Sequence, residues 1–217
     1  MLDHSFWHQK WEKNEIGFHM DCYNPWLENY ANEIFSGKEN VFVPLCGKTP
    51  DLKYLASLNK KVVGVEISHI AAQDFFKEQY PNTHVIEKKE KDFASYNNNY
   101  VQILTGDFFE LTQKHTRGFS AIYDRASLIA LPKKMRSDYV KHLRWLCGEA
   151  SMLLITLDYD QNKMGGPPFS VTPDEVEELF SYAKVNQLIR KNIIDKEPKF
   201  KQKGLKAFYQ TAYHIDW

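Results

Sequence analysis

Charged and aromatic side chains stand where three apolar runs of this sequence end. If those runs are parallel strands, their carboxyl ends lie along one edge of a sheet, and open α/β sheets bind ligands at that edge. Carboxylates accept hydrogen bonds there, an arginine holds anions, and an aromatic ring covers a flat ligand. The residues in these positions are Glu66, Asp107, Phe108 and Arg125.

Glu66 stands 19 residues after Gly47, which lies in the turn after the first apolar run. An acidic residue near that spacing can accept hydrogen bonds from both hydroxyls of a ribose. The alternative is a carboxylate that only marks the end of a strand. Gly47 is the only glycine of its turn, so the glycine-rich fingerprint of dinucleotide-binding proteins is missing. An acidic residue without the glycines that bind a pyrophosphate favours a nucleoside ligand such as S-adenosylmethionine over a nicotinamide dinucleotide.

The GKT triplet at 47–49 resembles the end of a phosphate-binding loop. That motif needs a second glycine five positions before the first letter, where this chain has Phe42, and Pro44 stiffens the turn. A phosphate-loop nucleoside triphosphatase is therefore excluded. Cys46, in the same turn, would act as a nucleophile only beside an activating base, and no spacing in the chain supplies one.

Two further strand ends offer an acceptor and a cation. Asp107 could accept a hydrogen bond from the amino group of an adenine and Phe108 could cover its ring; alternatively they are a turn residue and a core residue. Arg125 could hold a carboxylate or an anionic substrate, or it could pair internally with Asp124. The residues alone leave these alternatives open.

The first 35 residues precede the predicted sheet and are rich in aromatic side chains. Trp7 and Trp11 are four residues apart, so a helix would place them on one face. Indole faces attract cations such as a sulfonium; the alternative is a hydrophobic cap on the sheet. Phe18 follows Gly17 and suggests a substrate contact beside a lid hinge, whereas a lone His19 is more often structural than catalytic.

The elements that would position these residues follow from the apolar runs. Nearly continuous Val, Ile and Leu is typical of parallel strands buried on both faces, and the spacers carry helix signals such as a cap at Ser68 and a capping box at 172–175. We predict an α/β fold closed by two strands at 184–193 and 205–215, with 81–99 as a solvated loop or excursion. The five apolar runs are 41–45, 61–67, 101–106, 119–124 and 151–157.

Composition narrows the class of protein. The chain has 217 residues, which suits one domain, and its 28 basic and 28 acidic residues cancel, so a nucleic-acid partner is not expected. Its three cysteines leave one unpaired and form no C-x-x-C motif, which excludes a disulfide framework and a zinc ribbon. No apolar stretch approaches the roughly 18 residues that cross a bilayer. We expect a cytoplasmic protein that does not enter a membrane.

Several segments together resemble one family, the thiopurine S-methyltransferases of the bacterial type, which is also associated with methylation of selenite and tellurite. The segments run in order from residue 6 to 169, about three-quarters of the chain. The combination of VPLCGK, GVEIS and YDRASL is specific to that family. The matching segments are FWHQKW (6–11), IGFH (16–19), NPWL (24–27), VFVPLCGKTPDLKYLA (41–56), KVVGVEIS (61–68), GDFFEL (106–111), IYDRASLIALP (122–132), LLITLDYD (153–160) and GGPPF (165–169).

The resemblance implies a class I, S-adenosylmethionine-dependent methyltransferase fold. That fold is a three-layer, Rossmann-like α/β sandwich with a mostly parallel seven-stranded sheet whose last strand is antiparallel. It implies one domain over 1–217, in which 1–35 form an N-terminal helical cap over the cofactor. Phe18 matches an aromatic residue on the substrate side of the family's site. Trp7 is assigned to the cofactor site only because the residues around it match. The implied cofactor-binding residues are Trp7, Trp11, Leu45, Glu66, Asp107, Phe108 and Arg125.

The implied activity is in-line transfer of a methyl group from S-adenosylmethionine to a thiopurine or an aromatic thiol. A thiol ionises far more readily than an alcohol, so we expect no dedicated catalytic base and no metal. Arg125 would orient the cofactor's carboxylate or favour an anionic acceptor. We expect a monomer with a small-molecule thiol substrate. The alternatives are methylation of selenite or tellurite, a nicotinamide-dependent oxidoreductase, and a chalcogen-oxyanion or nucleoside-binding protein without turnover.

Overall fold

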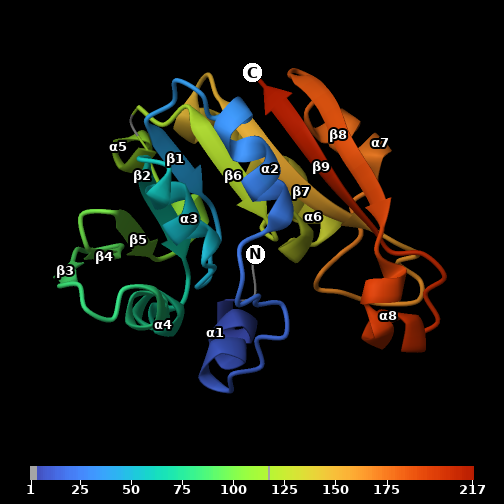
Figure 1. The fold of residues 1–217 in the computed structure, drawn as a ribbon, viewed down its shortest axis with the longest axis horizontal. Coiled ribbons are helices and arrows are strands. Elements are labelled where there is room, and N and C mark those ends of the chain that lie inside the picture. Colours follow the sequence, from blue (N-terminus) through green and yellow to red (C-terminus); the bar gives the residue numbers. More distant parts are fainter. Residues whose placement is uncertain (1–3, 117) are drawn as a thin grey trace. The chain divides into compact units, whose positions relative to one another are not determined.

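The computed structural model describes residues 4–116 and 118–217 (Figure 1). The chain divides into two compact units, Met1–Ile122 and Tyr123–Trp217. Alternating strands and helices run through both units, as predicted. No helix of the described residues is both long enough and apolar enough to cross a membrane.

The first unit contains a mostly parallel sheet whose strand order is β3-β4-β5-β2-β1-β6. β1 pairs in parallel with β2 and with the first residues of β6, and β2 pairs in parallel with β5. β1, β2, β5 and β6 are almost wholly buried, which confirms the prediction that these apolar runs are strands covered on both faces. The strands are β1 (Asn40–Val43), β2 (Lys61–Glu66), β3 (Ile86–Lys89), β4 (Ala94–Asn97), β5 (Val101–Thr105) and β6 (Ala121–Arg125).

The prediction that 81–99 is a solvated loop was wrong for eight residues, which form β3 and β4. β4 pairs antiparallel with β3 and with β5. All four residues of β3 are exposed, and β4 buries only alternate residues such as Ala94 and Tyr96. A half-buried polar hairpin produces no apolar run, so it escaped a search for buried strands. With it, the described part of the chain has nine strands rather than the seven expected.

Two helices of the first unit begin at side-chain caps, of which Ser68 was predicted and Asn24 was not. Ser68 caps α4 by accepting a hydrogen bond from the Ala71 backbone N–H at 3.5 Å, and Asn24 caps α2 in the same way. The expected N-terminal helical cap corresponds to α1 and α2, while residues 1–3 of that prediction lie outside the described residues. The helices are α1 (His4–Glu12), α2 (Pro25–Ile34), α3 (Asp51–Ser57), α4 (His69–Gln79), α5 (Gln113–Thr116) and the 3-10 turn η1 (Phe108–Glu110).

The second unit has the strand order β6-β7-β9-β8. β9 runs antiparallel to both β7 and β8, so the two predicted closing strands and the antiparallel last strand are confirmed. The predicted capping residue Thr172 accepts a hydrogen bond from the Glu175 backbone N–H at 3.3 Å. The elements are η2 (Leu128–Ala130), α6 (Lys133–Cys147), β7 (Ser151–Asp158), α7 (Pro173–Leu179), β8 (Lys184–Asn192), η3 (Ile194–Lys196), α8 (Pro198–Gln202) and β9 (Tyr209–Asp216).

Candidate cofactor site

Glu66 ends β2 as a buried carboxylate that is held by backbone N–H groups. Its Oε2 accepts from the Gly47 N–H at 2.9 Å and its Oε1 accepts from the Ser68 N–H at 2.9 Å. Burial raises the pKa of this carboxyl, and the N–H groups of Ser68, Gly47 and Ile67 oppose that rise. A carboxylate has about four acceptor positions, so these contacts leave capacity for a further donor.

The turn after β1 has an unusual backbone. Leu45 has φ 41° and Gly47 has φ 55°, so two residues of one short turn are left-handed. For a leucine this conformation is strained, and strain of that kind concentrates at binding sites. A Cβ on Gly47 would lie 3.2 Å from the Trp11 ring, so the absence of a side chain lets the indole lie against the turn. The predicted residues Trp11, Leu45 and Glu66 thus meet at one turn.

The aromatic residues of the N-terminal segment form one cluster. Helix α1 places Trp7 and Trp11 on the same side, and both rings meet Phe18 edge to face, with centroids 5.6 Å and 5.7 Å away. Trp11 is buried, whereas Phe18 is 38% exposed. The cluster therefore presents Phe18 to solvent and its deepest indole to the Gly47 turn.

Asp107 and Phe108 follow β5 in different environments. The Asp107 carboxylate accepts from the Phe109 N–H at 2.9 Å and contacts His4 Nε2 at 3.3 Å, which ties α1 to this turn. The Phe108 ring is buried and stacks over Phe42 of β1, with centroids 6.5 Å apart. Asp107 is accessible to a ligand, while Phe108 occupies the core position named as its alternative.

A hollow of about 590 Å³ opens beside the ends of β2 and β5. Ile67 and Gly106, the neighbours of Glu66 and Asp107, line it, as does His8 of α1. A Cβ on Gly106 would lie 2.6 Å from the Phe93 ring, so only glycine is accommodated there. Most of its other lining residues belong to β3, β4 and the turn between them, and Glu66 and Asp107 reach it only through these two neighbours.

Cys46 does not have the environment of a nucleophile. The side chain is buried, and burial together with the charge of Glu66 raises the pKa of its thiol well above the ordinary value. Gly64 leaves space for the sulfur, since a Cβ there would lie 2.6 Å from Cys46 Sγ. Cys46 is a packing residue of the turn.

Arg125 belongs to the second unit, at the end of β6. The neighbouring Asp124 carboxylate is fully buried and accepts from the Tyr139 hydroxyl at 2.7 Å and from the Ser127 N–H at 3.0 Å. Burial raises the pKa of Asp124 to about 6. In the part of the chain that the structure describes, Asp124 thus bonds to α6 and its own turn rather than to Arg125. Ala126, the next residue, has φ 92°, a second strained position directly after a strand.

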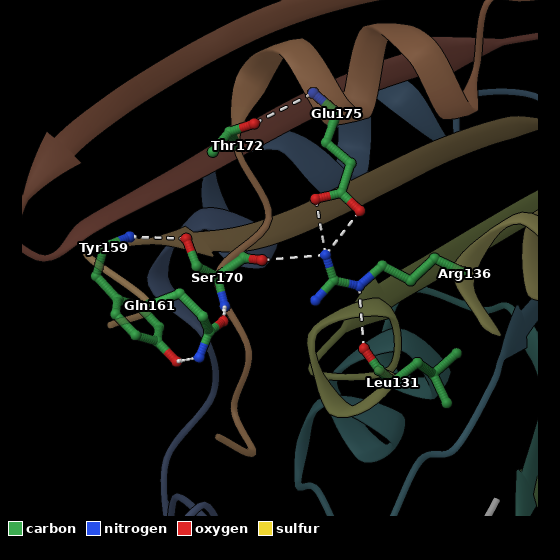
Figure 2. A network of polar contacts seen from close by, with 7 residues as sticks. All are labelled: Leu131, Arg136, Tyr159, Gln161, Ser170, Thr172 and Glu175. Carbon is green, nitrogen blue, oxygen red and sulfur yellow. Dashed lines mark hydrogen bonds and ion pairs between the residues drawn. The ribbon is translucent and has the colours of Figure 1, made fainter. Parts of the chain in front are cut away.

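Figure 2 shows a buried polar network of the second unit that the sequence analysis did not find. Arg136 donates from Nε to the Leu131 carbonyl at 3.0 Å and from Nη1 to the Ser170 carbonyl at 3.0 Å. The same Nη1 contacts both carboxylate oxygens of Glu175, at 2.7 and 2.8 Å. The ion pair joins α6 to the first turn of α7 across 39 residues of sequence, a separation that gives no local signal.

A comparison with known families gives a match over nearly the whole chain. The family described as thiopurine S-methyltransferase matches residues 2–216. The chain belongs to the thiopurine S-methyltransferase family. It is 42% identical over 212 residues to the thiopurine S-methyltransferase of Pseudomonas fluorescens (strain Pf0-1), with 97% of each chain covered. It is also 42% identical over 217 residues to that of Aliivibrio fischeri (strain ES114), covering 99% of this chain and all of the relative.

Solved structures show the fold of this thiopurine S-methyltransferase family member. A methyltransferase of Anabaena variabilis, described as dependent on S-adenosylmethionine, aligns with a TM-score of 0.66 at 16% identity and covers 100% of this chain and 95% of its own. A Burkholderia thailandensis 1,6-didemethyltoxoflavin N1-methyltransferase with bound S-adenosylhomocysteine aligns with a TM-score of 0.58 at 12% identity, over 97% and 86% of the two chains. The fold is the Rossmann-like α/β fold of class I methyltransferases, as the resemblance implied.

The site in the first unit suits S-adenosylmethionine, the cofactor of this methyltransferase class. A buried carboxylate with remaining acceptor capacity suits ribose hydroxyls, and the next residue, Ile67, lines a hollow. The turn at Gly47, where a Cβ would press on Trp11, sets an indole close to that carboxylate. The donor set lacks a phosphate cradle, in agreement with a nucleoside ligand.

Proposed function

We propose that this chain transfers the methyl group of S-adenosylmethionine to the sulfur of a thiopurine or another aromatic thiol. The observation that carries the proposal is the family match over residues 2–216, together with relatives at 42% identity that are named for this activity. S-Adenosylmethionine, when bound, supplies an electrophilic methyl group on a sulfonium centre.

Within the first unit, Glu66 binds the ribose hydroxyls of the cofactor and Asp107 binds the adenine amino group. The remaining acceptor capacity of Glu66 and the partial exposure of Asp107 support these roles. Phe108 contributes to the floor under the adenine. Leu45 offers the backbone of its strained turn to the cofactor.

The aromatic cluster seats the sulfonium and faces the acceptor. Trp7 and Trp11 direct indole rings at a cation that has lost its water. Phe18, which is edge-on to both rings and partly exposed, contacts the thiol substrate. The residues act by orienting the partners and excluding water, since the thiol needs no protein base.

Arg125 binds an anionic group, either the carboxylate of the cofactor or a thiolate acceptor. The engagement of Asp124 with Tyr139 supports this role, because the acid adjacent in sequence is bound elsewhere. The strained Ala126 beside it supports a functional turn.

The protein acts as a monomer in the cytoplasm, without nucleic acid. The cysteines Cys22, Cys46 and Cys147 are free thiols, as suits a reducing compartment, and the charge of the chain is balanced. Light scattering on the purified protein is expected to give one chain of 25.5 kDa.

The decisive experiment is a methyl-transfer assay with S-adenosylmethionine and a panel of acceptors: a thiopurine, a thiophenol, selenite and tellurite. We expect product from the two thiols. Product from the oxyanions alone would contradict the thiol assignment in favour of chalcogen methylation, and product from none would favour a binding protein. A thermal-shift screen with S-adenosylhomocysteine and NADH separates the oxidoreductase alternative, since only the first is expected to stabilise the protein.

A further inference from the structure

Lys48, the central residue of the GKT triplet, has no part in the function described so far. Its side chain is 9% exposed, and its Nζ lies 2.6 Å from Glu78 Oε1 and 4.0 Å from Asp74 Oδ2. The two acids stand four residues apart on α4 and therefore on one face of that helix. Both keep about 40% of their side-chain surface in solvent, so the lysine is the buried member of the group.

The turn after β1 and helix α4 are also joined through Glu66. Its carboxylate accepts from Gly47, in the turn after β1, and from Ser68, the N-cap of α4. The ion pair Lys48–Glu78 joins that turn to the last helical turn of α4, ten residues or about 15 Å further along the helix. Two contacts, one at each end of α4, therefore fix the distance and the angle between the turn and the helix.

A strained turn needs such support. Leu45 and Gly47 are left-handed, and unfavourable conformations persist only where the surroundings hold them. If the turn relaxed, the Gly47 N–H would leave Glu66 Oε2, and the carboxylate would be held only from the side of Ile67 and Ser68.

We propose that Lys48 is a positioning residue for the cofactor: its ion pair with Glu78 holds the strained turn so that the remaining acceptor positions of Glu66 stay aimed at the ribose. The inference rests on the proposed function, because it concerns the same site. Lys48 contacts no reactant. Its role is distinct from the phosphate binding that the GKT triplet first suggested.

The test is calorimetric titration of the full chain with S-adenosylhomocysteine, with kinetics in S-adenosylmethionine. Lys48→Met keeps the buried stem and removes the charge, and the two acids can turn to solvent. We expect its Kd for S-adenosylhomocysteine and its KM for S-adenosylmethionine to rise about tenfold, with kcat at saturation within twofold of the unsubstituted protein. Lys48→Arg, which restores the charge, is expected to stay within about threefold of the unsubstituted Kd. Glu78→Gln, altered at the exposed end, is expected to raise the Kd about threefold because Asp74 remains.

Lys60 supplies the matched control. It is a partly buried lysine whose Nζ donates to the Phe35 and Lys38 carbonyls at 2.8 and 2.6 Å, away from the turn after β1. Lys60→Met is expected to lower stability without changing the Kd. An equal Kd change in Lys48→Met and Lys60→Met, or none in Lys48→Met and Glu78→Gln, would overturn the inference alone. Failure of the unsubstituted protein to bind S-adenosylhomocysteine would instead overturn the proposed function, and this inference with it.

Discussion

The Glu66 turn of the first unit and the Arg136 cluster of the second unit both bury a charge, but the partners differ. Glu66 is held by backbone N–H groups and keeps acceptor capacity, and its neighbour Ile67 lines a hollow. Arg136 is held by two carbonyls and the Glu175 carboxylate, with no more than 2% of its side chain exposed. The first arrangement is open to a ligand and the second is closed by the fold. Among the described contacts, Glu66 has no opposite charge beside it, whereas Arg136 is paired with Glu175, so the first charge is the one available to a ligand.

The largest effect on stability is expected from removing Arg136, the cation of the second cluster. Arg136→Ala would leave the Glu175 carboxylate, whose side chain is only 11% exposed, without its cation, so the free energy of unfolding should fall by about 3 kcal/mol in urea denaturation. Arg144→Ala on the same helix is the control, because Arg144 is exposed and lies over the Tyr182 ring at 4.0 Å. A loss in Arg136→Ala no greater than in Arg144→Ala would remove the distinction between the two regions.

The buried Asp124 carboxyl of the second unit is also bound by the fold, and its effect on stability should depend on pH. Asp124 has a pKa raised from 3.8 to about 6, so the folded state holds its proton more tightly than the unfolded state. As pH rises through this interval the buried carboxyl must ionise, and its contribution to stability falls by up to about 3 kcal/mol, then levels off above pH 6.

Asp124→Asn removes the titration and keeps an oxygen for the Ser127 N–H. The difference in unfolding free energy between the unsubstituted protein and this variant should therefore shrink or reverse from pH 4 to pH 7. Denaturation curves at several pH values measure it. Parallel stability profiles for the two proteins would show that Asp124 ionises at its ordinary pKa.

Removing the Glu66 carboxylate is expected to weaken cofactor binding rather than to prevent folding. Glu66→Ala removes the charge-assisted hydrogen bonds to the ribose, so affinity for S-adenosylhomocysteine should fall by about 1.5–3 kcal/mol, roughly 10- to 100-fold. Glu66→Gln, which keeps an acceptor oxygen, should lose less. Calorimetry that gives the same Kd for Glu66→Ala as for the unsubstituted protein would remove Glu66 from the site.

The smallest effect separates the two roles of the indole cluster. S-Adenosylmethionine carries a sulfonium charge and S-adenosylhomocysteine does not. If Trp11 seats that cation, Trp11→Phe should weaken binding of the charged ligand by about 1 kcal/mol, roughly fivefold, and of the neutral ligand by less. Equal losses for the two ligands would identify Trp11 as a hydrophobic cap only.

Local patterns predicted the elements that depend on local chemistry. The Val- and Ile-rich runs predicted β1, β2 and β5 because these strands are buried on both faces. The four-residue spacing of Trp7 and Trp11 correctly placed them on one face of a helix. Half of the capping box at 172–175 is present, since Thr172 caps α7 but the Glu175 carboxylate is bound by Arg136.

Features that depend on distant partners escaped prediction. The β3–β4 hairpin has too few apolar residues to produce a run, and its pairing with β5 supplies the stability that its own sequence lacks. The Lys48–Glu78 contact spans 30 residues and the Arg136–Glu175 contact spans 39, so no spacing rule connects them. The His4 contact with Asp107 was missed for the same reason.

The sequence by itself determined the α/β alternation, the acid at the end of β2 and the family, because apolar runs, strand ends and ordered motifs are properties of neighbouring residues. Only the tertiary structure decided which buried charges are closed and which stay open, that Leu45 is left-handed and that Trp11 lies against Gly47. Those outcomes depend on desolvation and packing between segments far apart in the chain, which no local pattern contains.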